Sequence, residues 1–155
     1  MKRLRLLVRV LALALLTTPL LADALTGTWT LNVARSKFGT GAPPKSQTTQ
    51  LESIAGGLRE VVDRVNADGS TTHWEVRAMY DGKDYPVVGD PSRDTVALKK
   101  IDDSTIEVTN KKAGTVTTRM RIAVAADGKT RTNTVQGTDA AGKPFTSVML
   151  FDLKK

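Results

Sequence analysis

The chain has 155 residues, with 23 Lys and Arg against 16 Asp and Glu, one His and no Cys. The absence of cysteine excludes disulfides, thiolate metal sites and the acylated cysteine of a lipoprotein. The formal net charge of +7 is scattered, with no basic run longer than two residues after position 25, which argues against a nucleic-acid-binding surface.

Residues 1–24 have the three parts of a secretory signal peptide. Four basic residues fall within the first nine positions, an apolar run covers 10–16, and Ala22 and Ala24 stand three and one places before Leu25. The apolar run is well short of the ~20 residues that a transmembrane helix needs. We therefore expect cleavage after Ala24 and export to the periplasm or beyond the cell, with residues 25–155 as the mature domain.

Removing the leader takes four basic residues and Asp23 from the totals of 23 and 16, which leaves 19 and 15 and a net charge of +4. About 130 residues suit one domain with one core. Turn signals such as Asp68-Gly69 and Asp127-Gly128 recur at short intervals between runs rich in Val, Thr and Ile. The predicted strands are 26–33, 46–54, 58–65, 71–80, 85–88, 95–101, 105–111, 116–124, 130–137 and 145–153.

The predicted fold is all-β: an antiparallel up-and-down meander that closes into a barrel of about 8–10 strands. Short turns join consecutive strands as antiparallel neighbours, and closure removes the two exposed edges that an open meander would have. A short turn is expected at 34–38. Alternation places Trp74, Val76 and Ala78 inside, with His73 and Glu75 outside. An outer-membrane barrel would need an apolar outer band and aromatic girdles, but the chain has only 2 Trp, 2 Tyr and 3 Phe.

The Gly27-Thr28-Trp29 segment on the first strand resembles the opening signature of lipocalins and their calycin relatives. The run 27–38 and the segments 72–75, 80–86 and 107–112 are similar to small exported bacterial proteins described as lipocalin-like. The resemblance covers 25–153 and implies a barrel in which Gly27 and Trp29 form a structural plug at the narrow end. It further implies a basic residue on the Trp29 ring, for which Lys154 or Lys155 is the candidate.

The most suggestive polar feature lies on the strand 130–137, where Arg131, Asn133 and Val135 share one phase. In the relatives that the chain resembles, this phase faces the lumen. A buried guanidinium needs an anion or several acceptors, and a fatty-acid-type carboxylate is one candidate, with Tyr80 or Tyr85 as a second donor. The alternative is an edge strand or a register shifted by one residue, which would leave Arg131 in solvent.

The residues do not predict catalysis, a cofactor or a metal. A nucleophilic or metal site would have to use His73, whose strand phase directs it outward beside Glu75 and Arg77. Asp81, Asp84 and Asp90 lack the spacing of a calcium loop.

Three functions therefore stay open. The first is an exported monomeric protein that holds a small hydrophobic or anionic lipid-like ligand in its barrel. The second is a non-catalytic, inhibitor-like protein that acts through loops 34–45 and 81–93. The third is a small calycin-type enzyme.

Overall fold

The computed structural model describes residues 23–154, so the basic head and apolar run of the predicted signal peptide lie outside the described residues. Within 23–154 the chain forms strands and no helix. The strands are β1 (Gly27–Lys37), β2 (Ser46–Ile54), β3 (Gly57–Val65), β4 (Thr71–Met79), β5 (Asp81–Val88), β6 (Thr95–Lys100), β7 (Thr105–Lys112), β8 (Thr115–Val124), β9 (Thr130–Thr138) and β10 (Pro144–Leu153).

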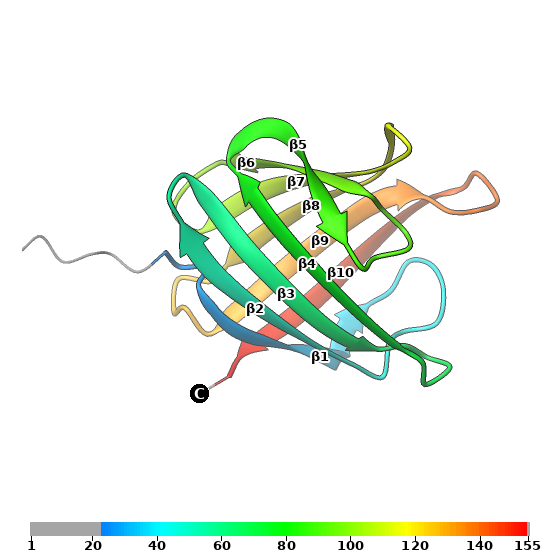
Figure 1. Ribbon diagram of the computed structural model, residues 1–155. Coiled ribbons are helices and arrows are strands. Elements are labelled where there is room, and N and C mark those ends of the chain that lie inside the picture. Colours follow the sequence, from blue (N-terminus) through cyan, green and yellow to red (C-terminus); the bar gives the residue numbers. More distant parts are fainter. Residues whose placement is uncertain (1–22, 155) are drawn as a thin grey trace, which may run out of the picture.

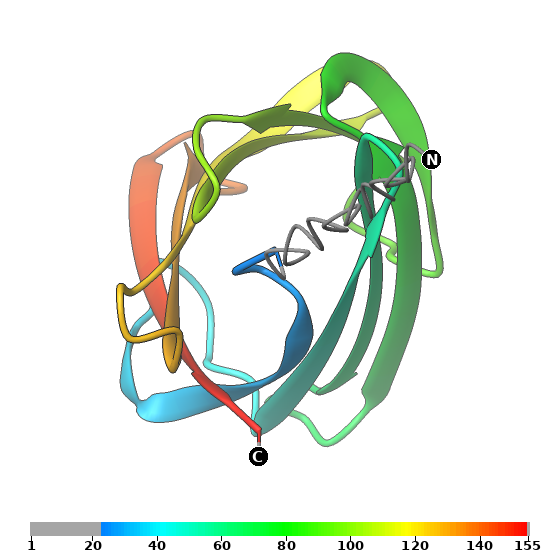
Figure 2. The same cartoon turned by 90° about the vertical axis from the view of Figure 1, so that its left-hand side faces the viewer.

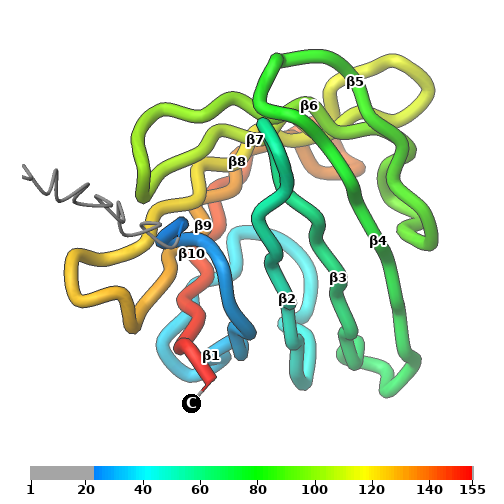
Figure 3. Tube along the Cα trace, turned by 60° about the vertical axis from the view of Figure 1, so that its left-hand side comes forward, coloured from blue at the N-terminus to red at the C-terminus, as the bar shows by residue number. Residues whose placement is uncertain are grey.

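Each strand pairs antiparallel with the next along the chain, and β10 returns to pair with β1, which closes the barrel (Figure 1). Trp29 of β1 stands opposite Leu153 of β10, and Figure 3 shows these first and last strands side by side. The predicted fold class, an all-β up-and-down barrel, is confirmed.

The tight hairpins follow from their turn residues. Gly69 and Gly128 have φ of 92° and 67°, a region that side chains with a Cβ adopt at a cost. The Asp68 carboxylate accepts a hydrogen bond from the Ser70 amide at 2.9 Å, and Asp127 accepts one from the Lys129 amide in the same way. These Asx turns fix the β3–β4 and β8–β9 connections without a long loop.

Two segments differ from the prediction. The expected turn at 34–38 is largely strand, because β1 continues to Lys37 through a register shift after Asn32, where the Ser36 hydroxyl donates to the Asn32 carbonyl at 2.7 Å. The strand predicted at 85–88 is present, but β5 begins earlier, at Asp81, and takes up most of the expected loop 81–93; it pairs irregularly with β6 between Asp81 and Asp84. The two long connections are therefore only 38–45 and 89–94.

Apolar side chains fill one end of the barrel. Trp29 is fully buried, and its indole Nε1 donates to the Leu25 carbonyl at 2.9 Å. Figure 2 looks into this end, where the first described residues lie across the opening. The buried apolar residues are Leu25, Trp29, Leu31, Leu51, Leu58, Val62, Trp74, Val76, Ala78, Val96, Leu98, Ile106, Val108, Ile122, Val124 and Phe151. The predicted inward phase of Trp74, Val76 and Ala78 is confirmed.

Candidate functional site

The other half of the barrel encloses a cavity of about 430 Å³. Its mouth reaches Thr40 in the loop 38–45 and Asp139 in the turn that follows β9. Below the mouth the wall is made of inward-facing strand residues and of the loop 89–94. The principal wall residues are Gln47, Glu60, Arg64, Trp74, Asp90, Arg93, Asn110, Thr118, Met120, Arg131, Asn133, Val135, Phe145 and Met149.

The cavity exists because inward side chains become polar along the barrel axis. On β2 the inward positions run from Leu51 through Thr49 to Gln47, and β7 runs from Ile106 to Asn110 in the same direction. The apolar half contains a second cavity of only about 20 Å³, room for roughly one water molecule. The sequence alternation therefore produces a packed half and a hollow half.

Arg131 forms the floor of the cavity. Its side chain is 1% exposed, and its Nε and Nη1 have no hydrogen-bond partner. The guanidinium carbon lies 4.3 Å from the centroid of the Phe151 ring and 5.4 Å from that of Trp29. Burial lowers the pKa of Arg131 to about 10, against the opposing charge of Glu60, so the group is charged at neutral pH.

The position of Arg131 shows which way its side chain faces on β9 and which cation lies on the Trp29 ring. The strand β9 is internal, with Arg131 opposite Phe151 of β10 and Val124 of β8. The solvent-exposed edge-strand alternative is therefore wrong. The cation on Trp29 is Arg131, whereas Lys154 is exposed and Lys155 lies outside the described residues. Arg131 faces inward near the start of β9, so its guanidinium reaches the Trp29 ring from inside the barrel.

Asn133 is the next inward residue of β9 and is 5% exposed. Its Oδ1 is buried without a hydrogen-bond partner, and so is the indole Nε1 of Trp74 on β4. Together with Arg131, these side chains give the cavity wall buried donors and an acceptor that other described residues leave unpaired. A buried polar atom without a partner costs about 1–3 kcal/mol, so each favours a ligand or water that completes it.

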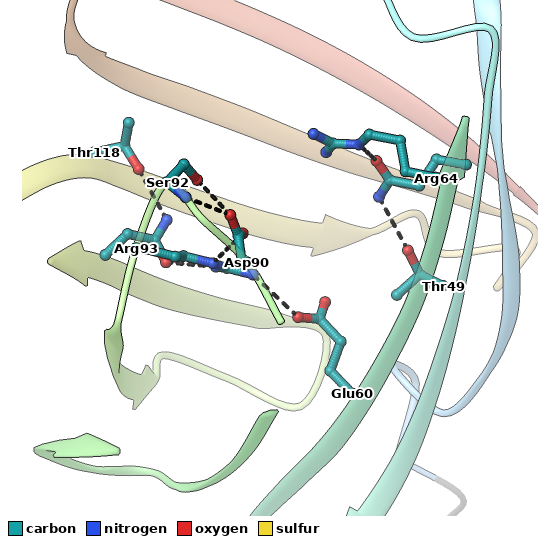
Figure 4. A network of polar contacts seen from close by, with 9 residues as sticks. Thr49, Glu60, Arg64, Asp90, Ser92, Arg93 and Thr118 are labelled. Atoms are coloured by element: carbon teal, nitrogen blue, oxygen red, sulfur yellow. Dashed lines mark hydrogen bonds and ion pairs between the residues drawn. The ribbon is translucent and has the colours of Figure 1, made fainter. Parts of the chain in front are cut away.

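A network of ion pairs and hydrogen bonds ties the loop 89–94 to the inner wall of the barrel (Figure 4). The Arg93 guanidinium, 8% exposed by residue, donates to Asp90 at 2.9 Å and to the Asn110 amide oxygen at 2.6 Å, and lies 3.7 Å from Glu60. Because its three nitrogens face acceptors, Arg93 is committed to this network. It fixes the loop to β3 and β7.

Arg64 of β3 approaches the cavity from beside this network. Its Nε donates to the Gln47 amide oxygen at 2.8 Å, and Gln47 in turn donates to the Thr49 hydroxyl at 3.2 Å. The guanidinium lies 4.8 Å from the centroid of the Trp74 ring. Desolvation, together with the nearby charge of Arg93, lowers the pKa of Arg64, although Asp90 and Glu60 oppose the shift.

The wall has two chemically different sides. The polar side is built from β2, β3, β7 and the loop 89–94. The side formed by β8, β9 and β10 presents the apolar Met120, Val135, Phe145 and Met149, together with the polar Arg131 and Asn133 of β9. The arrangement suits a small amphipathic molecule with one apolar face and several oxygen or nitrogen atoms.

The charges inside the wall leave a positive excess. Arg64, Arg93 and Arg131 face Glu60 and Asp90. A further carboxylate at the rim, on Asp139, accepts hydrogen bonds from the amides of the following turn. Asp90 and Glu60 both lie against Arg93, so neither Arg64 nor Arg131 has an ion-pair partner among the described residues. Arg64 donates to Gln47, whereas two buried nitrogens of Arg131 have no hydrogen-bond partner.

Tyr80 and Tyr85 do not line this cavity, so the prediction that they act as second donors beside Arg131 is not supported by their positions. Tyr80 follows the last residue of β4, where its amide donates to the Gly56 carbonyl, and burial raises the pKa of its hydroxyl to about 12. The Tyr85 hydroxyl donates to Asp81 at 3.0 Å. Both rings pack against the apolar cluster instead.

Gly27 lies close to the indole of Trp29 and to Leu153. It has φ of 139°, and a Cβ at this position would lie 2.7 Å from Cδ1 of Leu153. His73 is exposed on the outer face, with its Nδ1 2.7 Å from an Asp63 carboxylate oxygen and its Nε2 3.6 Å from Glu75. Its predicted outward direction is confirmed.

Several wall residues were missed in the reading of the sequence. Glu60 and Arg64 lie two residues from the buried Leu58 and Val62 and therefore share their face of β3. Strand phase alone is sufficient to place them inside. Arg93 belongs to a loop, where no periodicity indicates direction. Its inward position depends on partners from β3 and β7 that lie far away in the sequence.

No protein-family model matches the chain, and no curated protein matches it. Among residues 23–154, no helix has the length and apolar character needed to cross a membrane. The same residues contain no cluster of three or more His, Asp or Glu side chains placed to hold a metal ion.

Proposed function

We propose that the protein is exported and binds a small organic anion inside its barrel, without catalysing a reaction. The observation that carries the proposal is Arg131, a buried guanidinium at the floor of a cavity of about 430 Å³ with two unpaired nitrogens. A carboxylate offers two acceptor oxygens to the planar fork of a guanidinium and neutralises its charge. Binding would therefore neutralise the buried charge and bring acceptor oxygens to a guanidinium for which the described residues provide none.

The shape of the interior supports a short ligand over a long acyl chain. A fatty-acid tail needs an extended apolar channel, whereas the apolar half around Leu58 and Ile106 has room for roughly one water molecule. The hollow half carries charged groups on β3, on the loop 89–94 and on β9. Of the ligands expected from the sequence, the anionic head is thus better supported than the lipid tail.

The export part of the proposal concerns the bond between Ala24 and Leu25. Leu25 is 2% exposed, and its carbonyl accepts the Trp29 indole hydrogen bond, so the mature chain would begin inside the packed end of the barrel. Mass spectrometry of the protein from culture fluid and from periplasmic extract should give a mass that begins at Leu25. A full-length mass in the cytoplasmic fraction alone would contradict export.

The binding test is native mass spectrometry of protein purified from its own host, followed by calorimetry with short carboxylates such as hexanoate and phenylacetate. We expect a bound small acid at one per chain, and affinity that falls at least about tenfold in Arg131→Met. Arg119→Met is the matched control, because Arg119 is exposed on β8. Arg131→Lys keeps the charge and tests the site if the Met variant does not fold.

Two outcomes would overturn the proposal. One is an empty native protein that binds none of the acids. The other is binding that is equally tight in the wild type and in a folded Arg131 variant, because the anion would then sit elsewhere.

A further inference from the structure

Arg131 and Asn133 are consecutive inward residues of β9, so their Cα atoms are separated by roughly 7 Å along the strand. Both are at least nine-tenths buried, and both line the same cavity. One small molecule can therefore contact both side chains. A carboxylate on Arg131 would leave the adjoining atoms of the ligand beside the Asn133 amide.

The Asn133 amide needs a hydrogen-bond donor from the ligand. Its Oδ1 is buried without a donor, and a neighbouring carboxylate oxygen cannot supply one because an ionised carboxylate only accepts. A hydroxyl both donates and accepts, so it pairs with the amide in either of its two orientations. The hydroxyl has to lie within a few bonds of the carboxylate, since the two protein groups are neighbours on one strand.

The apolar residues of the wall require an apolar group on the ligand. Val135 continues the inward phase of β9 toward the mouth, with Met120 of β8 opposite it. Met149 of β10 stands opposite Asn133 and lines the same cavity. Methionine side chains adapt their shape and make favourable contacts with aromatic rings. A ligand that is polar throughout would leave these residues uncovered, whereas an apolar group next to the hydroxyl-bearing carbon would bury them.

We infer that the ligand is a compact 2- or 3-hydroxycarboxylate that carries an apolar group, with its carboxylate on Arg131, its hydroxyl on Asn133 and its apolar group against Met120, Val135 and Met149. The inference rests on the proposed anion binding at Arg131. To that anion binding the inference adds a hydroxyl and an apolar group on the ligand. Test acids that lack one or the other can examine each group separately.

The experiment measures dissociation constants by calorimetry for acids that differ by one hydroxyl. The pairs are phenylacetate with mandelate, and 3-phenylpropanoate with its 2-hydroxy and 3-hydroxy derivatives, in both enantiomers. One added hydrogen bond should make the best hydroxy acid about five- to tenfold tighter than its parent acid. The diol 1-phenylethane-1,2-diol, which lacks the carboxylate, should bind at least about tenfold more weakly than mandelate, and lactate should lose affinity because it lacks the ring.

The variant test uses Asn133→Leu, which is close in size and cannot form hydrogen bonds. It should bind the parent and hydroxy acids with equal affinity. Gln136→Leu is the matched control, because Gln136 is an exposed amide on the outer face of the same strand, and it should keep the wild-type preference. The wild-type comparison of the acid pairs stands on its own if Asn133→Leu does not fold.

The outcomes separate the two proposals. If every parent acid binds the wild type as tightly as its hydroxy derivatives while Arg131→Met weakens all of them, the hydroxycarboxylate inference is wrong and anion binding at Arg131 stands. A hydroxyl preference that survives in folded Asn133→Leu also overturns the inference. If no acid binds, or if Arg131→Met changes nothing, the proposed function fails first.

Discussion

The guanidinium of Arg131 and the indole of Trp29 lie 5.4 Å apart, measured from the guanidinium carbon to the ring centroid. The guanidinium thus contacts the packed end of the barrel, while the same residue lines the cavity. The residue that closes the floor is also the residue proposed to bind the anion. Under the proposed function, stability and binding are therefore coupled at this contact.

Replacing Trp29 should strongly destabilise the fold. Trp29→Ala removes a fully buried ring, its hydrogen bond to Leu25 and a cation–π partner of Arg131. We expect the free energy of unfolding to fall by about 3–5 kcal/mol, measured by urea denaturation. Val88→Ala, at a side chain that is 69% exposed, should change it by less than about 0.5 kcal/mol. A Trp29→Ala loss as small as the control would show that the plug does not stabilise the barrel.

Arg93 and Glu60 should be energetically coupled. Arg93→Met leaves the Glu60 and Asp90 carboxylates without their cation in a mostly buried place, and breaking such a pair costs about 3–5 kcal/mol. Glu60→Gln removes one of the stranded charges, so the double variant should lose about 1–3 kcal/mol less than the sum of the single losses. Denaturation of all four proteins measures the coupling. Strict additivity would mean that the two side chains do not interact.

Gly89 should tolerate alanine poorly. Its φ is 94°, and a Cβ would collide with the His73 carbonyl oxygen, so both backbone strain and a clash oppose the substitution. Gly82 is the matched control, with φ of 74° and open space around the added atom. We expect Gly89→Ala to lose at least about 1–3 kcal/mol of unfolding free energy, and Gly82→Ala about 1 kcal/mol. Equal losses would show that the close approach of the loop to β4 is unimportant.

His73 should titrate above its ordinary pKa of 6.5, because its hydrogen bond to Asp63 raises the pKa of the imidazole. A raised folded pKa means that the contribution to stability is fully present below the unfolded pKa and is lost as pH rises through the folded pKa. Because the group is exposed, the effect on stability should be small. NMR titration of the imidazole should show the shift in the wild type and its reduction in Asp63→Asn. An unchanged pKa in that variant would contradict the assignment.

Strand phase and turn chemistry were sufficient to predict much of this molecule. Asx-Gly pairs mark the hairpins because they adopt positive φ, and alternation predicted that Val76 and Ala78 face inward. Alternation put Arg131 and Asn133 in one phase, but only the resemblance to lipocalin-like proteins suggested that this phase faces the lumen. This reasoning did not extend to Tyr80, because phase distinguishes inside from outside but does not give position along the barrel axis.

The segment 81–94 shows what local sequence patterns could not predict. Gly82 and Pro86 interrupt the pattern around β5, so only 85–88 was predicted as a strand, within a longer connection at 81–93. The pairing of β5 with β6 comes from tertiary context rather than from local propensity. The inward direction of Arg93 likewise depends on Glu60 and Asn110, which reach it only when β3 and β7 are in place.

The pairing of β1 with β10 has a consequence for how the chain acquires its shape. The other nine pairings join strands that follow one another in sequence, and such hairpins close with little loss of chain entropy. We expect the two terminal strands to meet last. Until then, β1 and β10 are free edges able to pair with the same edges of another molecule. Exchange of the first strand between two chains is therefore the misassembly to which this barrel is most exposed.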